Sequence, residues 1–448
     1  MRRFVCLLMC AFGMVSPQTV VAAGVSQTVG VLSANDVPPL PPSLGVVVLG
    51  HGNGHGVGLS QWGAFSWAKN QNKSAAEILA FYYGADSVLS KVSAQESTSE
   101  FSVSLSAFND RTRLVFVSPS ADVPLFSSAV GAGVVPVFGS LVFEVVPNSA
   151  PPKWRVAKSV SRSCTPTGLV EVPGTFGPST VFSPISQQPD APVTSLPLVC
   201  SPTGALLAYR GVFAIRHGTL GELRLVNVVS VESYLRTVVV SEMPSSWALS
   251  APQAVLAQVV AARSYALADS WARTFTYKPF WPQFFVAHAR YSYARTCDTQ
   301  SCQVYAPAGS RTGISAALVV RERPLVSALV LSSDGVVLRS AATSRVVLAM
   351  FSSSNGGLSV AVGLFPSVVD RQDTQAFNPW ANWYRTLLFA EVLSKFPTVG
   401  VVQKLDVVTG DFGRVVSVRV VGRDSTVVVS GATFRSVFAL PSAYFASV

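Results

Sequence analysis

Residues 234–266 limit the fold and the chemistry of this chain more than any other stretch. They read YLRTVVVSEMPSSWALSAPQAVLAQVVAARSYA and contain one carboxylate, Glu242. Three valines precede Glu242, and Met243 and Pro244 follow it. Burial in such surroundings raises the pKa of a carboxyl group, and a carboxyl that keeps its proton near neutral pH can act as a general acid. The alternative is that Glu242 caps a helix or pairs with a nearby base.

Helices are expected on both sides of Glu242. Ser230 can cap a helix that ends just before it. Ser250 is predicted to begin the next helix, with Pro252 in its first turn and Gln253 completing a capping box. The apolar stripe of this second helix consists of Val255, Val259, Ala262 and Ala266. Glu242 is therefore predicted to lie in the turn between two helices, and such turns often carry chemistry.

The composition indicates a folded protein with an anionic partner. Of the 448 residues, 49% are hydrophobic and only 12% are charged, so the chain can bury a large core and is long enough for two or three domains. The net charge of +10 suits a cell wall or a membrane surface. Basic residues do not cluster with aromatic ones, so no nucleic-acid partner is expected.

The first 23 residues have the pattern of a secretory signal peptide. Arg2 and Arg3 form a basic start, residues 4–15 are apolar, and residues 21–23 supply the small side chains of a cleavage site. An uncleaved anchor is the alternative, but the apolar run is short for a membrane span. We therefore expect an extracellular protein, secreted or at the cell wall, with no stable membrane span after cleavage.

Four cysteines follow the signal peptide, and an even number suits an oxidising compartment. We predict the disulfides Cys164–Cys200 and Cys297–Cys302, the pairs closest in sequence, although other pairings stay open. A zinc ion bound near His288, Cys297 and Cys302 is an alternative to the second disulfide. In an exported protein the disulfide is the favoured of the two. No cofactor is expected to be required.

The alternation of helical and strand-like patterns predicts a mixed α+β protein. A strand is expected at residues 46–49, a helix capped by Ser74 and Glu77, and a hairpin over residues 415–430. The predicted segments are the signal peptide at 1–23, a Pro-rich linker at 24–44, a glycine-rich segment of the core at 45–90, a β-rich insert at 91–205, and the main part of the core at 206–448.

Residues 50–63 form a glycine-rich stretch, GHGNGHGVGLSQWG. Its spacing does not match a Walker loop, a dinucleotide-binding motif or a nucleophile elbow. Glycines let the backbone approach another group closely, and His51 and His55 project from this stretch. The sequence contains no HExxH motif, so a zinc peptidase site is not supported.

Several long motifs of this chain resemble those of the SpoIID/LytB family. They are GHGVGLSQWGA at residues 54–64, VVVSEMP at 238–244 with Trp247 after it, AQVVAARSYA at 257–266, CQVY at 302–305 and FSSSNGG at 351–357. This family comprises the stage II sporulation protein D and the amidase enhancer LytB. Its sporulation members are lytic transglycosylases that cleave peptidoglycan glycan strands stripped of stem peptides.

The resemblance implies a SpoIID-like catalytic core in which Glu242 is the catalytic acid. It also implies a groove lined by the glycine-rich and Ser-rich motifs. The candidate substrate-binding residues are His55, Ser60, Gln61, Tyr234, Trp247, Gln258, Arg263, Tyr265, Ser353, Ser354 and Asn355. The three aromatic residues among them could stack on sugar rings or serve as core residues. Gln258 and Arg263 could orient Glu242 or bind the sugar acetamides.

The chain departs from the family in three places. Its glycine-rich motif precedes the EMP motif, whereas it follows that motif in the sporulation protein. His51 stands where an Arg is usual, and Arg236-Thr237 stand where a Gly is usual. The order of the motifs implies that they converge in space rather than in sequence.

The expected function is cleavage of the bond between N-acetylmuramic acid and N-acetylglucosamine, with Glu242 as the only general acid and base and 1,6-anhydromuramoyl ends as products. An ordinary hydrolase would need a second carboxylate. The candidates for it in the sequence are Glu232, Asp269, Asp370 and Asp373. Two other functions are considered: a cell-wall-binding modulator of an amidase, and a serine hydrolase that uses Ser60 with His55.

Overall fold

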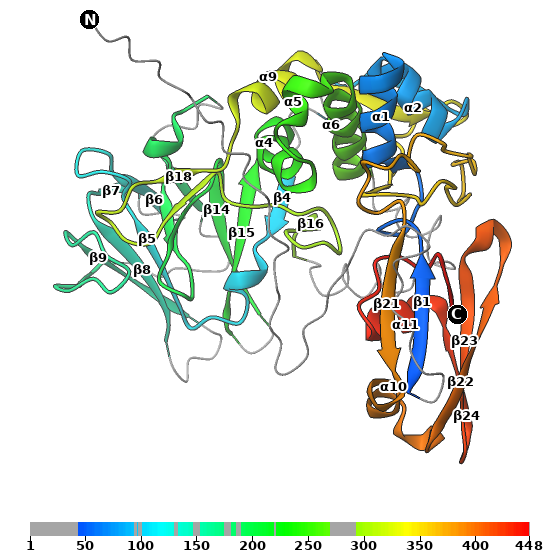
Figure 1. Cartoon of the computed structure of the whole chain (residues 1–448). Helices are drawn as coiled ribbons and strands as arrows, with labels where there is room; N and C mark the ends of the chain where they lie inside the picture. The colour runs from blue at the N-terminus through cyan, green and yellow to red at the C-terminus, as the bar shows by residue number, and fades with distance from the viewer. Residues whose placement is uncertain are drawn as a thin grey trace, which may run out of the picture. The chain divides into compact units, whose positions relative to one another are not determined.

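The computed structural model describes residues 44–93, 96, 101–129, 133–146, 153–173, 181–184, 190–218, 221–268 and 293–447 (Figure 1). The chain divides into two compact units, residues 1–50 with 382–448, and residues 51–381. The predicted signal peptide and nearly all of the linker lie outside the described residues, as do Asp269 and His288. Within the described residues, no helix has the length and hydrophobicity that crossing a membrane requires.

In its described residues, the smaller unit is built from two three-stranded sheets and two α-helices. One sheet places β1 (Gly45–Gly50) between β21 (Trp383–Leu388) and β25 (Phe445–Ser447). The other has the order β22 (Val402–Thr409), β23 (Val415–Gly422) and β24 (Thr426–Ser430). The helices are α10 (Phe389–Lys395) and α11 (Gly431–Val437). The strand predicted at residues 46–49 and the hairpin predicted over 415–430 are both confirmed.

The larger unit contains two large sheets that pack on each other. The eight-stranded sheet has the order β10 (Val170–Glu171), β9 (Trp154–Ser159), β8 (Ser140–Val145), β5 (Arg113–Val117), β12 (Leu198–Cys200), β13 (Leu206–Ala208), β17 (Gly309–Arg311), β18 (Val319–Val320). The seven-stranded sheet has the order β16 (Thr296–Cys297), β4 (Phe101–Ser104), β15 (Leu223–Val229), β14 (Val212–His217), β11 (Val181–Pro184), β6 (Leu125–Ala129), β7 (Gly133–Val137). Phe116 of β5 contacts Phe213 of β14, with 5.3 Å between ring centroids, and so joins the two sheets.

Strand pairing runs across the segment boundaries expected from the sequence. β4 pairs with β15, and β12 pairs with β13, although each pair has one strand on either side of residue 205. The β-rich segment and the following segment therefore share their sheets. Together with the helices described below, these sheets confirm the mixed α+β class.

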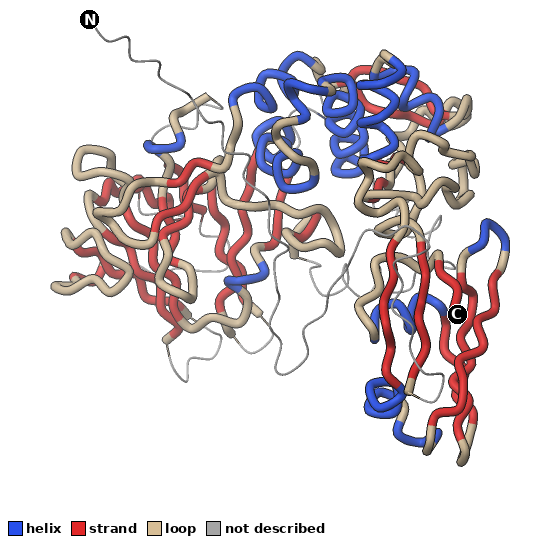
Figure 2. Tube along the Cα trace, viewed as in Figure 1, coloured by secondary structure: helices blue, strands red, loops and turns tan. Residues whose placement is uncertain are grey.

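The helices of the larger unit gather around α6 (Pro252–Leu267), as Figure 2 shows. Its neighbours are α1 (Gln61–Gln71), α2 (Ala75–Tyr83), α4 (Val231–Glu242), α5 (Trp247–Ser250) and α9 (Pro324–Ser332). Strand β19 (Val336–Ser340), paired with β3 (Ser87–Lys91), also packs on α6. Almost every residue of α6 is buried because partners surround it on all sides, so it lacks the polar face of a surface helix.

Two of the three predicted helix caps are confirmed. Ser74 and Glu77 form a capping box at α2, and the Ser230 hydroxyl accepts the Ser233 N–H at α4. The capping box predicted at Ser250 is wrong, because Ser250 ends the short helix α5 and Ala251 precedes α6 without a side-chain cap. The Gln253 side chain instead accepts the backbone N–H of Ala75 at 2.9 Å, so a tertiary contact replaces the local one.

Both predicted disulfides form. Cys164–Cys200 ties the loop after β9 to β12, and Cys297–Cys302 closes a short loop after β16. Because the second pair is bonded, neither thiolate is free to bind the zinc ion considered above. His288, the third residue of that alternative, lies outside the described part of the chain.

Candidate functional site

Glu242 is the last residue of α4, so it begins the turn that the sequence predicts and is followed by the short helix α5. Met243 and Trp247 beside it are buried, whereas the Glu242 side chain stays partly exposed. Its Oε1 accepts the backbone N–H of Val304 at 2.8 Å. Burial raises the pKa of Glu242, and this hydrogen bond opposes the rise only in part. Burial therefore shifts Glu242 toward its protonated form relative to a glutamate in water.

Val304 follows the loop that the Cys297–Cys302 disulfide closes. No side-chain pattern in the sequence identified this part of the chain as belonging to the site. Cys297 lies in β16, which runs parallel to β4. The next residue but one after Cys302 is Val304, so the disulfide stands beside the N–H that holds Glu242. A backbone donor carries no residue-type preference, and only the family motif at residues 302–305 indicated this loop.

The glycine-rich and Ser-rich segments lie side by side, as the resemblance implies. β2 (Leu59–Ser60) pairs in parallel with β20 (Phe351–Ser352). The backbone N–H of Trp62 donates to the Ser353 carbonyl at 3.0 Å. Gly58 has a φ of +65°, and a Cβ there would lie 2.1 Å from the Met350 carbonyl oxygen. The close approach of the two segments thus requires glycine at this position.

The Asp373 carboxylate joins the two segments by accepting hydrogen bonds from both. It accepts the Ser60 hydroxyl at 2.5 Å, the Ser354 hydroxyl at 2.6 Å and the Gly356 N–H at 2.7 Å. Ser60 also caps α1 by accepting the Gly63 N–H. Ser60 and Ser354 are fully buried, so both act in the scaffold of the site.

Asp370 is the second buried carboxylate of this cluster. It accepts the Tyr82 hydroxyl at 2.5 Å and the Asn355 amide at 3.0 Å. Burial, and after it the neighbouring charge of Asp373, raise the pKa of Asp370 to about 6. A Cβ at Gly63 would lie 2.1 Å from the Tyr82 hydroxyl oxygen, which accounts for glycine there in α1.

An aromatic cluster connects the glycine-rich segment with the turn after Glu242. The ring of Trp247 lies 4.8 Å from that of Trp62 and 4.4 Å from that of Phe65. Phe377 completes the cluster and is 44% exposed, whereas Trp247 is 5% exposed. Trp247 is therefore a core residue. The exposed aromatic surface of the cluster belongs to Phe377 and to the partly buried Trp62, and the sequence did not single out either residue for binding.

Helix α6 connects to both segments through side chains. Gln61 approaches Gln258, with 3.5 Å between the amide nitrogen and oxygen. Tyr265 packs edge-on against Phe351 of β20 at 6.3 Å. The candidate residues on α6 thus meet the glycine-rich and Ser-rich segments from inside the unit, where Gln61, Gln258 and Tyr265 are all buried.

Tyr234 and Arg263 are fully buried and have structural partners. Tyr234 stacks on Tyr305 with 4.9 Å between centroids. Arg263 forms a two-pronged ion pair with Glu232, with both distances 2.7 Å, and also donates to the Ser333 hydroxyl. The remaining candidates with partial exposure are Glu242, His55 and Ser353; the His55 Nδ1 accepts the Val57 N–H at 3.0 Å.

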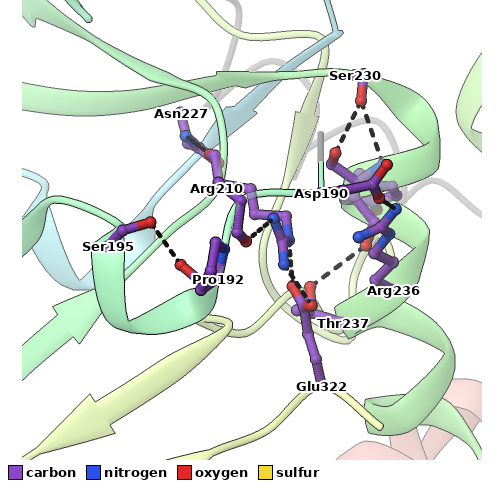
Figure 3. Close-up of polar contacts among 12 residues, drawn as sticks. Asp190, Pro192, Ser195, Arg210, Asn227, Ser230, Arg236, Thr237 and Glu322 are labelled. Atoms are coloured by element: carbon purple, nitrogen blue, oxygen red, sulfur yellow. Dashed lines mark hydrogen bonds and ion pairs between the residues drawn. The ribbon is translucent and has the colours of Figure 1, made fainter. Parts of the chain in front are cut away.

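The unusual Arg236 of α4 has a partner from the β-rich segment. Figure 3 shows its guanidinium facing Asp190, and the two are 2.5 Å apart. The same stretch is held by Arg210, which donates to the Ala191 carbonyl at 2.9 Å and forms a buried ion pair with Glu322. Arg236 thus serves to attach α4 to the segment after β11, a contact that a glycine at this position could not make.

Two comparisons with known proteins identify relatives, and a third finds none. Residues 219–344 match the family described as SpoIID, stage II sporulation protein. An uncharacterized protein of Brachyspira hyodysenteriae is 46% identical over 61 residues, which cover 11% of this chain and 16% of that protein. No solved structure matches.

The family match covers the segment around Glu242, whereas the glycine-rich and Ser-rich segments lie outside it. It includes Glu242, helix α6 and the Cys297–Cys302 loop with Val304. A SpoIID domain is consistent with a cell-wall-related function, and the disulfides fit an extracellular protein. The match shows a SpoIID domain at residues 219–344, and this domain supports membership of the SpoIID/LytB family.

Proposed function

We propose that this protein is an exported peptidoglycan lytic transglycosylase. It would cleave the bond between N-acetylmuramic acid and N-acetylglucosamine in glycan strands that have lost their stem peptides. Glu242 would be its general acid and base, and the products would carry 1,6-anhydromuramoyl ends. The observation that carries this proposal is the setting of Glu242, a carboxyl group with a raised pKa, partial exposure and a fixed orientation.

The reaction needs one carboxyl group that changes its role. Protonated Glu242 donates its proton to the glycosidic oxygen as the bond to C1 of the muramoyl residue breaks, which releases the N-acetylglucosamine hydroxyl. The Glu242 carboxylate then takes the proton of the muramoyl C6 hydroxyl while that oxygen bonds to C1. Glu242 ends the cycle protonated, and no water is consumed.

Three of the acids considered for a hydrolase lie in the described part of the chain, and each of them has structural partners. Glu232 is paired with Arg263, and Asp370 and Asp373 are fully buried and accept several hydrogen bonds each. An inverting or retaining hydrolase requires a second carboxylate that faces the sugar. None of the three described acids considered for this role is placed in that way. This favours the transglycosylase route, in which the muramoyl C6 hydroxyl of the substrate is the nucleophile.

The serine hydrolase alternative conflicts with the hydrogen bonds of Ser60. Its hydroxyl donates to Asp373 and accepts the Gly63 N–H in a fully buried position. A nucleophile needs an accessible oxygen and a base that accepts its proton. Ser60 instead serves as a helix cap that joins α1 to the Asp373 cluster.

Incubation with purified, peptide-free glycan strands tests the proposal. Mass spectrometry should detect anhydromuramoyl products with the wild type and not with Glu242→Gln. Glu171→Gln is the matched control, because Glu171 is an exposed glutamate in β10 of the same unit. The proposal fails if the wild type yields no anhydro product, or if Glu242→Gln yields as much as the wild type.

The alternative of a non-catalytic, wall-binding modulator of an amidase draws on the net charge of +10. Binding to purified sacculi in the absence of glycan cleavage, together with faster peptide release by an added cell-wall amidase, would identify this role. Equal stimulation by Glu242→Gln and wild type would show that the carboxyl group is not needed for it.

A further inference from the structure

The loop after β16 holds helix α4 at two points. The Val304 N–H donates to Glu242 at the C-terminal end of α4. The Gln303 side-chain oxygen accepts the Tyr234 hydroxyl at 3.0 Å near the start of the same helix. The Gln303 side-chain nitrogen also approaches the Ala262 carbonyl of α6 at 3.3 Å. Two consecutive loop residues thus fix both ends of α4 and tie it to α6.

The disulfide anchors this loop to the sheet. Cys297 is fully buried in β16 and its backbone N–H lies 3.3 Å from the sulfur of Cys302. The turn is completed by hydrogen bonds from the Cys302 N–H to Thr299 and from the Tyr305 N–H to Asp298. Through its disulfide, Cys302 is covalently attached to Cys297 of strand β16. Val304, which donates to Glu242, follows Cys302 by two residues.

We propose that the Cys297–Cys302 disulfide is a positioning element for Glu242, because it holds the loop in the conformation in which Val304 donates to the carboxylate. The cysteines do not touch the substrate in this proposal, so they are positioning rather than catalytic residues. The inference deepens the transglycosylase proposal and rests on it only for the kinetic measurement below.

Loss of the disulfide has two physical consequences for Glu242. The carboxylate gains rotational freedom, and small errors in placing a catalytic group lower the rate steeply. The ionised form also loses its donor, so burial acts unopposed and the pKa rises further. Burial and the Val304 N–H are the causes of the pKa shift of Glu242, and no charged neighbour is among them.

The test compares Cys297→Ala/Cys302→Ala with Cys164→Ala/Cys200→Ala, which removes the other disulfide of the same unit. Amide hydrogen exchange of the Val304 N–H is measured by NMR in each folded variant. We expect at least about 10-fold faster exchange at Val304 in the first variant and wild-type exchange there in the second. On peptide-free glycan strands, kcat should fall roughly 10- to 100-fold in the first variant with little change in KM.

The pH profile separates positioning from a general loss of structure. The folded fraction is measured at each pH and the rate is divided by it. A general loss of structure then leaves the apparent pKa of Glu242 in the kcat profile unchanged, whereas loss of the Val304 donor moves it upward. If the first variant does not fold, exchange at Val304 is measured in Cys164→Ala/Cys200→Ala before and after treatment with a dithiol. The dithiol reduces Cys297–Cys302 to two thiols and is itself oxidised to a disulfide.

Unchanged exchange at Val304 after loss of the disulfide would overturn the inference. So would wild-type kcat and pH profile in the folded Cys297→Ala/Cys302→Ala variant. A wild type that releases no anhydro product defeats the proposed function alone, since hydrogen exchange at Val304 still decides whether the disulfide positions the loop on Glu242.

Discussion

Two carboxylate settings of the larger unit, at Glu242 and at Asp373, differ in the number of donors that face them. Glu242 receives one hydrogen bond in the described structure, from the Val304 N–H, and keeps part of its side chain exposed. Asp373 is fully buried and receives the Ser60 and Ser354 hydroxyls and the Gly356 N–H. Both have a raised pKa, and burial is the main cause in each case.

The comparison shows that a raised pKa by itself does not identify a catalytic acid. Asp373 joins chain segments that are far apart in sequence, and its oxygens are already occupied by protein donors. In the described structure Glu242 accepts one hydrogen bond, so its carboxyl group can still exchange a proton with a substrate. Removal of Glu242 leaves the backbone N–H of Val304 without its acceptor. We therefore assign a chemical role to Glu242 and a structural role to the Asp373 cluster. Substitution of Glu242 should mainly affect activity, and substitution of Asp373 should mainly affect stability.

The largest difference is expected from Glu242→Gln. Loss of the general acid should lower the rate of glycan cleavage by about 10²- to 10⁴-fold. The free energy of unfolding should change by less than about 1 kcal/mol, because glutamine keeps an oxygen for the Val304 N–H. Chemical denaturation followed by near-UV circular dichroism, beside the cleavage assay, measures both. A variant that is strongly destabilised would make Glu242 a structural residue like Asp373.

The reverse result is expected from Asp373→Ala. Three buried donors lose their acceptor, so the free energy of unfolding should fall by about 3 kcal/mol or more. Asp122→Ala, at an exposed position of the same unit, is the control and should unfold like the wild type. Denaturant titration of both variants checks this. A change within about 1 kcal/mol for Asp373→Ala would remove the contrast between the two sites.

The smallest effect concerns the pH dependence contributed by Asp370. Its pKa rises from 3.8 to about 6 on folding, so the folded state holds a proton that the unfolded state has lost between these values. The stability that this group contributes is present below about pH 4 and is lost as the pH rises through about 6. Asp370→Asn cannot titrate, while Asp373, Tyr82 and Asn355 around it are unchanged.

The stability of the wild type relative to Asp370→Asn should therefore fall between about pH 4 and pH 6 and stay level above it. Thermal unfolding of the two proteins in parallel, at several pH values, gives the difference and cancels the titration of other groups. A difference that rises with pH would mean that Asp370 is stabilised in its charged form, in conflict with its buried setting.

The sequence allowed prediction of those features that depend on neighbouring residues or on family motifs. The strand predicted at residues 46–49 and the caps at Ser74 and Ser230 follow from local patterns, and the structure has them. The resemblance placed the glycine-rich and Ser-rich segments together, and they pair as β2 and β20.

Features that depend on distant partners could not be predicted. Ser250 lost its expected capping role because Gln253 is engaged by Ala75, 178 residues away in sequence. Asp373 meets Ser60 across 313 residues, so no periodicity or spacing indicated that it anchors the site. The donor to Glu242 is a backbone N–H, which any residue except proline supplies.

Direct titration of the Glu242 carboxyl group tests the central claim. Protein labelled with ¹³C at the glutamate carboxyl carbon is titrated by NMR, and the Glu242 signal is assigned as the one missing from Glu242→Gln. We predict a pKa above the ordinary value of 4.5 for Glu242. A pKa at or below that value would contradict it, because Glu242 would then enter the reaction without the proton that the glycosidic oxygen must receive.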